Sequence, residues 1–150
     1  MQRAADECRE RSRRSGRVAA NVAAMPTADQ LREAMERYAT VASSKDADAY
    51  AALFTPDAVQ VDPYPTAPNV GRDAIRAFIE RSYDACETMT FEVTEVHPVA
   101  DRAAITFHIT VTLQGGSTMH IRGVEIFTVT DEGLISAVEA YWGDQDVTFE

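Results

Sequence analysis

Hydrophobic and polar residues alternate with a period of two from Met119 to Thr130, which is the pattern of a β-strand with one buried face. One side of this alternation is apolar except for Glu125 and consists of Met119, Ile121, Gly123, Glu125, Phe127 and Val129. A carboxylate on a buried face loses its hydration and is very costly when unpaired. Three possibilities follow for Glu125: the row is not buried, the carboxyl is protonated, or it is paired.

Three helices are predicted before this strand. The first begins at Thr27, because Thr27 and Gln30 have the spacing of a capping box. Its apolar stripe recurs at intervals of three and four and includes Tyr38, which taken alone fits a core aromatic residue. A short second helix over 47–54 ends before Pro56, since proline lacks an amide proton. A third helix is predicted over 72–86.

The remaining apolar patterns predict strands. A short strand covers 58–61, and four longer strands cover 91–99, 103–113, 119–130 and 134–142. Gly-Gly at 115–116 and Asp-Glu-Gly at 131–133 mark turns between them. Helices followed by a run of antiparallel strands indicate an α+β fold. A curved sheet with the helices over its concave face would enclose an apolar pocket for a small ligand.

A proline-rich loop over 62–71 follows the short strand, and Asp62 stands at its entry. A carboxylate at a strand end before a stiff loop could lie over the mouth of a cavity. Asp-Pro is also a common way to start a turn, and the local sequence alone favours this simpler reading.

Length and charge narrow the class of protein. Of the 150 residues, 25–150 fit one domain, whereas 1–24 contain six arginines and few large apolar residues, which predicts a disordered basic extension. The formal net charge of −10 argues against nucleic-acid binding, and no stretch is long and apolar enough to span a membrane. Cys8 and Cys86 lie far apart and read as free thiols, which predicts a cytoplasmic location. The three histidines have no metal-binding spacing, so no metal is expected.

The chain from about 25 to 142 resembles the ketosteroid isomerases, which have the NTF2-like cone fold shared with SnoaL-type cyclases. Three segments at the family's spacing carry the resemblance: Arg37-Tyr38, Asp62-Pro63-Tyr64 with Gly71-Arg72 after it, and 127–135 running into Ala140-Tyr141-Trp142. The Gly-Arg and Asp-Glu-Gly motifs recur throughout NTF2-like proteins and identify the fold. The resemblance implies a curved, mostly antiparallel sheet with three N-terminal helices over its concave face.

The resemblance also implies a catalytic set. Asp62 stands where the family has its general base, and Tyr38 stands where it has an oxyanion donor. Glu125 stands where the family has a protonated aspartic acid, which an apolar site keeps neutral. The implied reaction moves a double bond of a 3-oxo-Δ5-steroid into conjugation by proton transfer through a dienolate. No cofactor is implied, because the electrons stay within the substrate.

Two departures from the family pattern concern this site. Glu125 is one methylene longer than the family's aspartic acid. The family's additional tyrosines, which hydrogen-bond the catalytic tyrosine, appear as Phe54 and Ile79, so that support is expected to be absent. The resemblance places the pocket wall at Phe107, Val138 and Trp142, with Ile105 and Ile109 nearby.

Other readings remain open at this point. The chain could be another NTF2-like enzyme of the polyketide cyclase or epoxide hydrolase type, although cyclases usually lack the strand acid. It could also be a module that binds a small apolar ligand without chemistry. Relatives of this fold usually dimerise through the outer sheet face, so the resemblance implies a homodimer, with Thr106, Thr110 and Thr112 as a candidate surface.

Overall fold

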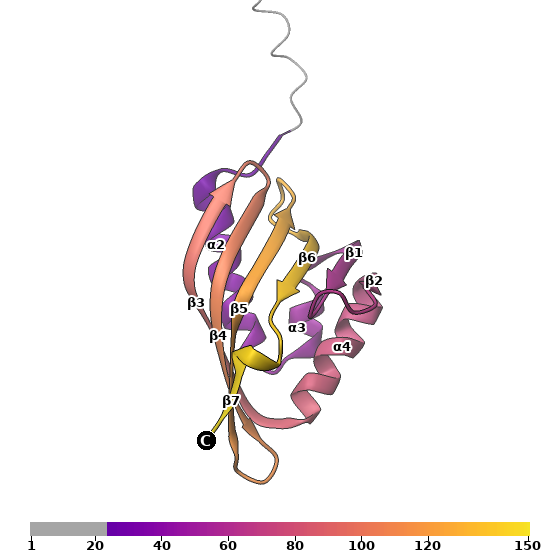
Figure 1. Ribbon diagram of the computed structural model, residues 1–150. Coiled ribbons are helices and arrows are strands. Elements are labelled where there is room, and N and C mark those ends of the chain that lie inside the picture. Colours follow the sequence, from indigo (N-terminus) through magenta and orange to yellow (C-terminus); the bar gives the residue numbers. More distant parts are fainter. Residues whose placement is uncertain (1–23) are drawn as a thin grey trace, which may run out of the picture.

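Helices pack on one face of a mixed, curved sheet in the computed structural model, which describes residues 24–150 (Figure 1). The α-helices of this part are α2 (Ala28–Ala42), α3 (Ala47–Ala51) and α4 (Arg72–Asp84). The strands are β1 (Phe54–Val61), β2 (Asn69–Val70), β3 (Cys86–Val99), β4 (Arg102–Leu113), β5 (Thr118–Val129), β6 (Ile135–Tyr141) and β7 (Val147–Phe149). A 3-10 turn, η2 (Asp144–Asp146), precedes β7. The expected α+β cone is confirmed.

The order of strands in the sheet is β2-β1-β6-β5-β4-β3, and β7 pairs with β5. Strands β3 to β6 follow one another as antiparallel neighbours, as the turn signals predicted, whereas β1 joins β6 in parallel. The two-residue β2 and three-residue β7 were not predicted, because they are too short to show a period. The expected extension at 1–24, with Cys8, lies outside the described residues except for its last position. Cys86 is a buried free thiol.

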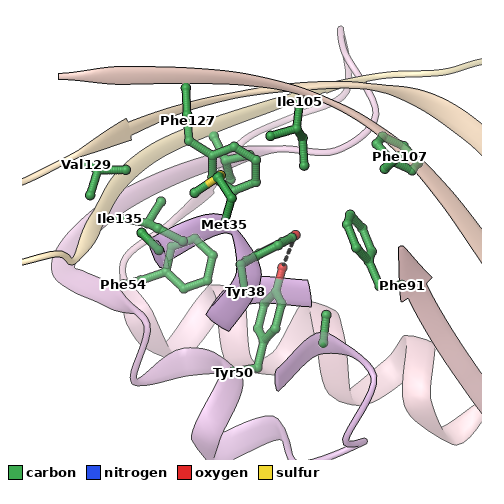
Figure 2. Packing of buried hydrophobic residues seen from close by; sticks show 14 of the residues in the cluster. Met35, Tyr38, Tyr50, Phe54, Phe91, Ile105, Phe107, Phe127, Val129 and Ile135 are labelled. Carbon is green, nitrogen blue, oxygen red and sulfur yellow. Dashed lines mark hydrogen bonds between the residues drawn. The ribbon is translucent and has the colours of Figure 1, made fainter. Parts of the chain in front are cut away.

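The first helix follows the predicted pattern. Thr27 N–H donates to Gln30 Oε1 at 2.8 Å and Gln30 N–H donates to Thr27 Oγ1 at 3.1 Å, so the capping box is present. The buried stripe of α2 packs against the sheet, and Figure 2 places Met35 and Tyr38 beside Phe127. The ring of Tyr38 meets that of Phe127 edge to face, with centroids 4.8 Å apart. This packing brings the Tyr38 hydroxyl to the interior of the cone.

The structure corrects the predicted break before the first strand. β1 begins at Phe54, and Pro56 lies inside it rather than before it. Phe54 pairs with Ile135 and Val59 with Ala137, so five steps along β1 match two along β6. Proline is tolerated in such an irregular segment because its missing amide proton has no ladder partner to lose.

The Gly-Arg motif joins α4 to β1. Gly71 has φ +88°, a backbone conformation that glycine adopts without strain, and its N–H donates to Ala58 O at 2.7 Å. The Arg72 guanidinium donates two hydrogen bonds to Phe54 O, at 3.1 and 2.5 Å. These bonds fix the start of α4 over the sheet. None of the helices in residues 24–150 has the length and apolar character needed to span a bilayer.

Candidate active site

A cavity of about 390 Å³ lies between the helices and the concave face of the sheet. Its wall is mostly apolar and includes Phe78, Ile79, Met89, Phe91, Phe107, Ile109, Val111, Met119 and Ile121. Five polar side chains also line it: Tyr38, Tyr50, Asp62, Ser82 and Glu125. A concave apolar wall with a few converging polar groups is the usual form of a small-molecule site.

Glu125 is buried, with 3% of its surface exposed, which removes the first of the three possibilities for this residue. The described residues place no basic side chain within ion-pair distance of it. Its Oε1 accepts a hydrogen bond from the Tyr38 hydroxyl at 3.5 Å. Its Oε2 is buried and has no hydrogen-bond partner among residues 24–150. Burial raises the pKa of Glu125 well above its usual range, and the nearby Asp62 charge raises it further. This environment therefore favours the neutral, protonated form of Glu125.

Tyr38 lies between two hydrogen-bonding partners inside the cone. Its hydroxyl is 3.1 Å from the Tyr50 hydroxyl and 3.5 Å from Glu125 Oε1. Burial and the neighbouring Glu125 raise the pKa of Tyr38 well above that of a free phenol. The hydroxyl therefore stays protonated at neutral pH and can donate to an oxygen in the cavity.

Tyr50 supplies the support that the sequence did not predict for Tyr38. Phe54 and Ile79 carry no hydroxyl, as expected, but Tyr50 on α3 reaches the Tyr38 hydroxyl from another direction (Figure 2). The expectation that Tyr38 lacks a supporting tyrosine is therefore wrong. A five-residue helix has too short a period to indicate which of its faces meets α2, so the pattern could not reveal this contact.

Asp62 directly follows the last residue of β1 and lines the cavity. The indole Nε1 of Trp142 donates to its Oδ1 at 2.9 Å. Burial raises the pKa of Asp62, and this hydrogen bond lowers it. The pKa of Glu125 is raised more strongly, so Asp62 is the carboxyl that ionises first. One carboxyl of the site can therefore act as a base, while the other favours its neutral form.

The structure places the predicted wall residues in two groups. Phe107, Ile109 and Trp142 line the cavity. Ile105 and Val138 do not; both are fully buried in the packed core. Ile105 shares the inner face of β4 with Phe107 and Ile109, but it belongs to the buried cluster that also contains Met35 of α2 and Phe127. The period of a strand identifies its inner face and cannot show where along the strand a helix closes the cavity.

An α+β cone that encloses an apolar cavity with a tyrosine and two carboxyls defines this chain as an NTF2-like protein. The SnoaL-like domain family matches residues 35–138, and the chain belongs to that family. It is 32% identical over 125 residues to the steroid Delta-isomerase of Nocardioides simplex, across 79% of this chain and 96% of the relative.

Solved structures show the same fold. An epoxide hydrolase/cyclase-like enzyme of pyran ring formation in the polyether salinomycin is 25% identical, with a TM-score of 0.75 over 81% of this chain and 97% of the other. A computationally designed 17-OHP binder is 24% identical, with a TM-score of 0.73 over 81% and 98% of the two chains. A protein of Mycobacterium tuberculosis is 23% identical, with a TM-score of 0.72 over 87% and 99%.

Proposed function

We propose that this chain is a steroid Δ5-isomerase that converts 3-oxo-Δ5-steroids into 3-oxo-Δ4-steroids. The observation that carries the proposal is that Tyr38, Asp62 and Glu125 line one apolar cavity, with the Glu125 carboxyl buried. The similarity to a steroid Delta-isomerase supports the same reaction class.

Asp62 acts as the base in this proposal. Its ionised carboxylate removes a proton from the carbon between the ketone and the double bond. The electron pair of that C–H bond moves toward the carbonyl and leaves a dienolate. Protonated Asp62 then returns the proton to the far carbon of the dienolate, so the double bond has moved and no atom is gained or lost. Such positioned proton transfer contributes on the order of 10²–10⁴-fold.

Tyr38 and Glu125 stabilise the dienolate oxygen. Both groups are protonated, and both are held by the fold before the substrate arrives, so they need not reorganise when charge develops. Glu125 Oε2 has no hydrogen-bond partner in the described residues, and it is the carboxyl oxygen available to present a proton to the cavity. One well-placed donor of this kind is worth roughly 10²–10³-fold.

A second candidate function is an acid–base reaction on an epoxide. The likeness to an epoxide hydrolase/cyclase-like enzyme favours it, because a neutral Glu125 could protonate an epoxide oxygen while Asp62 deprotonates the attacking hydroxyl. This reaction uses the same two carboxyls, so mutation of either one alone does not separate the two proposals. The choice of substrate separates them.

The decisive experiment follows the absorbance of the conjugated enone formed from 5-androstene-3,17-dione. We expect turnover by the wild type and a loss of at least 10²-fold in Asp62→Asn, which keeps the shape and removes the base. Asp57→Asn is a matched control, because Asp57 is exposed on β1, the strand that leads to Asp62. Glu125→Gln keeps a neutral donor and should lose less activity than Glu125→Ala.

Three results would contradict the isomerase proposal. They are the absence of enone formation by the wild type, near-wild-type turnover by Asp62→Asn, and ring formation from an epoxy alcohol without any isomerase activity. Binding of the steroid without a change in absorbance would instead indicate a binding module.

A further inference from the structure

Three side chains continue the hydrogen bonding from Tyr38 toward the edge of the sheet, and the proposed isomerase mechanism gives none of them a role on the substrate. Tyr50 Oη lies 3.1 Å from Tyr38 Oη. Gln60 Nε2 donates to Tyr50 Oη at 3.2 Å, and Asn69 Nδ2 donates to Gln60 Oε1 at 3.1 Å. Gln60 is 1% exposed, whereas Asn69 is half-buried at the edge strand β2. The chain of hydrogen bonds therefore runs from the sheet edge to the cavity.

The chemistry of these groups gives the chain a direction. An amide nitrogen donates and an amide oxygen accepts, so the bond from Asn69 turns the oxygen of Gln60 outward and its NH₂ group toward Tyr50. The oxygen of Tyr50 then accepts, and its single proton has one acceptor among the described residues, which is Tyr38. With its oxygen occupied in this way, Tyr38 has its own proton free for Glu125 or for an oxygen in the cavity.

We propose that Gln60 and Asn69 are positioning residues that set this direction, so that the proton of Tyr38 points into the cavity. The proposal rests on the proposed isomerase function and adds to it two residues that do not touch the substrate. The side-chain amide groups of Gln60 and Asn69 can both rotate by half a turn and still form a hydrogen bond with each other. In that reversed arrangement Tyr50 donates to Gln60, Tyr38 donates to Tyr50, and the dienolate oxygen loses a donor.

Asn69→Asp should impose the reversed direction. A carboxylate at position 69 only accepts, so it draws the Gln60 NH₂ group toward itself and turns the Gln60 oxygen toward Tyr50. We expect kcat to fall roughly 10- to 100-fold, which is no more than the fall expected when one oxyanion donor is removed. KM should change less than threefold, because the unreacted ketone carries little of the charge that Tyr38 stabilises.

The Tyr50→Phe variant separates a positioning role of Asn69 from a general disturbance of the structure by the Asn69→Asp substitution. In Tyr50→Phe the chain is interrupted, so the direction at Gln60 cannot reach Tyr38. Adding Asn69→Asp to Tyr50→Phe should therefore change kcat less than about twofold, because coupled residues are not additive. Val70→Asp is the matched control: it adds the same charge to the neighbouring, exposed position of β2 and should leave kcat unchanged.

The direction of the hydrogen bonds can also be measured without catalytic turnover, by the ionisation of a bound phenol. A steroidal phenol resembles the dienolate, and the absorbance of the bound phenol reports how much of it is ionised. At the same pH, the ionised fraction of the bound phenol should be larger in the wild type than in Asn69→Asp. In the Tyr50→Phe background, this fraction should be the same with and without Asn69→Asp.

The failure of the proposed function and the failure of the positioning role give different results. If the wild type does not isomerise the ketosteroid, the proposed function fails, and the phenol measurement still tests the direction of the hydrogen bonds. If the wild type is active, the positioning role fails on any of three results: an unchanged kcat in Asn69→Asp, an equal fall in the Tyr50→Phe background, or an equal fall in Val70→Asp.

Discussion

Trp142 holds Asp62 by a single hydrogen bond, from the indole Nε1 to Oδ1 at 2.9 Å. The two residues are 80 positions apart, and they meet because β6 runs parallel to β1 and ends beside it. The indole is the one donor in the described residues that lowers the pKa of this carboxyl against the effect of burial. Trp142 therefore does more than form the apolar wall that the sequence predicted.

Trp142→Phe should shift the pH dependence of activity. The variant loses the hydrogen bond that lowers the pKa of Asp62, so that pKa rises further above its ordinary value of 3.8. The base form of Asp62 exists above its pKa, and the acidic limb of the kcat/KM profile should therefore move to higher pH. At a pH on this acidic limb the variant should be less active than the wild type by roughly tenfold, consistent with the loss of one hydrogen bond to a charged group.

Tyr141→Phe is the control for this shift. Tyr141 is the neighbouring residue, and its hydroxyl donates to Glu139 outside the cavity. Its kcat/KM profile should overlie that of the wild type. An acidic limb that stays in place in Trp142→Phe would show that the indole does not set the pKa of Asp62.

Gly123 leaves room for the residues that hold the site together. A Cβ at this position would lie 2.6 Å from Tyr141 O, 2.9 Å from Phe107 Cζ and 3.0 Å from Trp142 Cβ. Gly123→Ala should therefore cost about 1–3 kcal/mol of unfolding free energy and lower kcat by displacing Trp142 from Asp62. Chemical denaturation and the enone assay measure the two effects.

Gly143→Ala provides the comparison for that substitution. The three atoms nearest to its Cβ would all belong to the flexible side chain of Gln145, which can move away. We expect a change below about 0.5 kcal/mol and unaltered turnover. If the two alanine variants were equally stable, the close approach at Gly123 would not be a constraint.

Local periodicity accounts for the part of the site that was predicted. The period of two on β5 singled out Glu125 as a carboxyl on a buried face, and the capping box with the helical stripe placed Tyr38 inward. Both features depend on the residues of one element. The strand order β3 to β6 also followed from tight turns between neighbours in the sequence.

Contacts between distant elements account for the rest. Gln60 Nε2 donates to the hydroxyl of Tyr50 on α3, and no period of the four-residue strand predicted at 58–61 indicates this contact. The bond between Asp62 and Trp142 depends on the parallel pairing of β1 with β6. Likewise, the burial of Ile105 in the core cluster rather than in the cavity wall depends on residues of α2 and of other strands.

Ile105 and Ile109 test where the cavity ends. Ile105→Ala should cost about 2–5 kcal/mol of unfolding free energy, because it empties a packed core position, and should leave KM within twofold. Ile109→Ala removes a partly exposed wall residue, so it should cost less stability and raise KM several-fold. Both lose the same atoms, so a reversed pattern would mean that the cavity extends under α2.

Glu125 should make the stability of the protein fall as pH rises. Its pKa in the folded protein is well above the ordinary 4.5, so the folded state keeps a proton that the unfolded chain releases. The stabilising contribution is complete below pH 4.5 and is lost as pH rises toward the folded pKa, by about 1.4 kcal/mol per pH unit for one proton. Glu125→Gln cannot titrate, so the difference in unfolding free energy between wild type and variant should shift in favour of the variant over this range. Denaturant titrations at a series of pH values measure this difference, and a difference that does not change with pH would mean that Glu125 is ionised in the folded protein and cannot serve as the second donor.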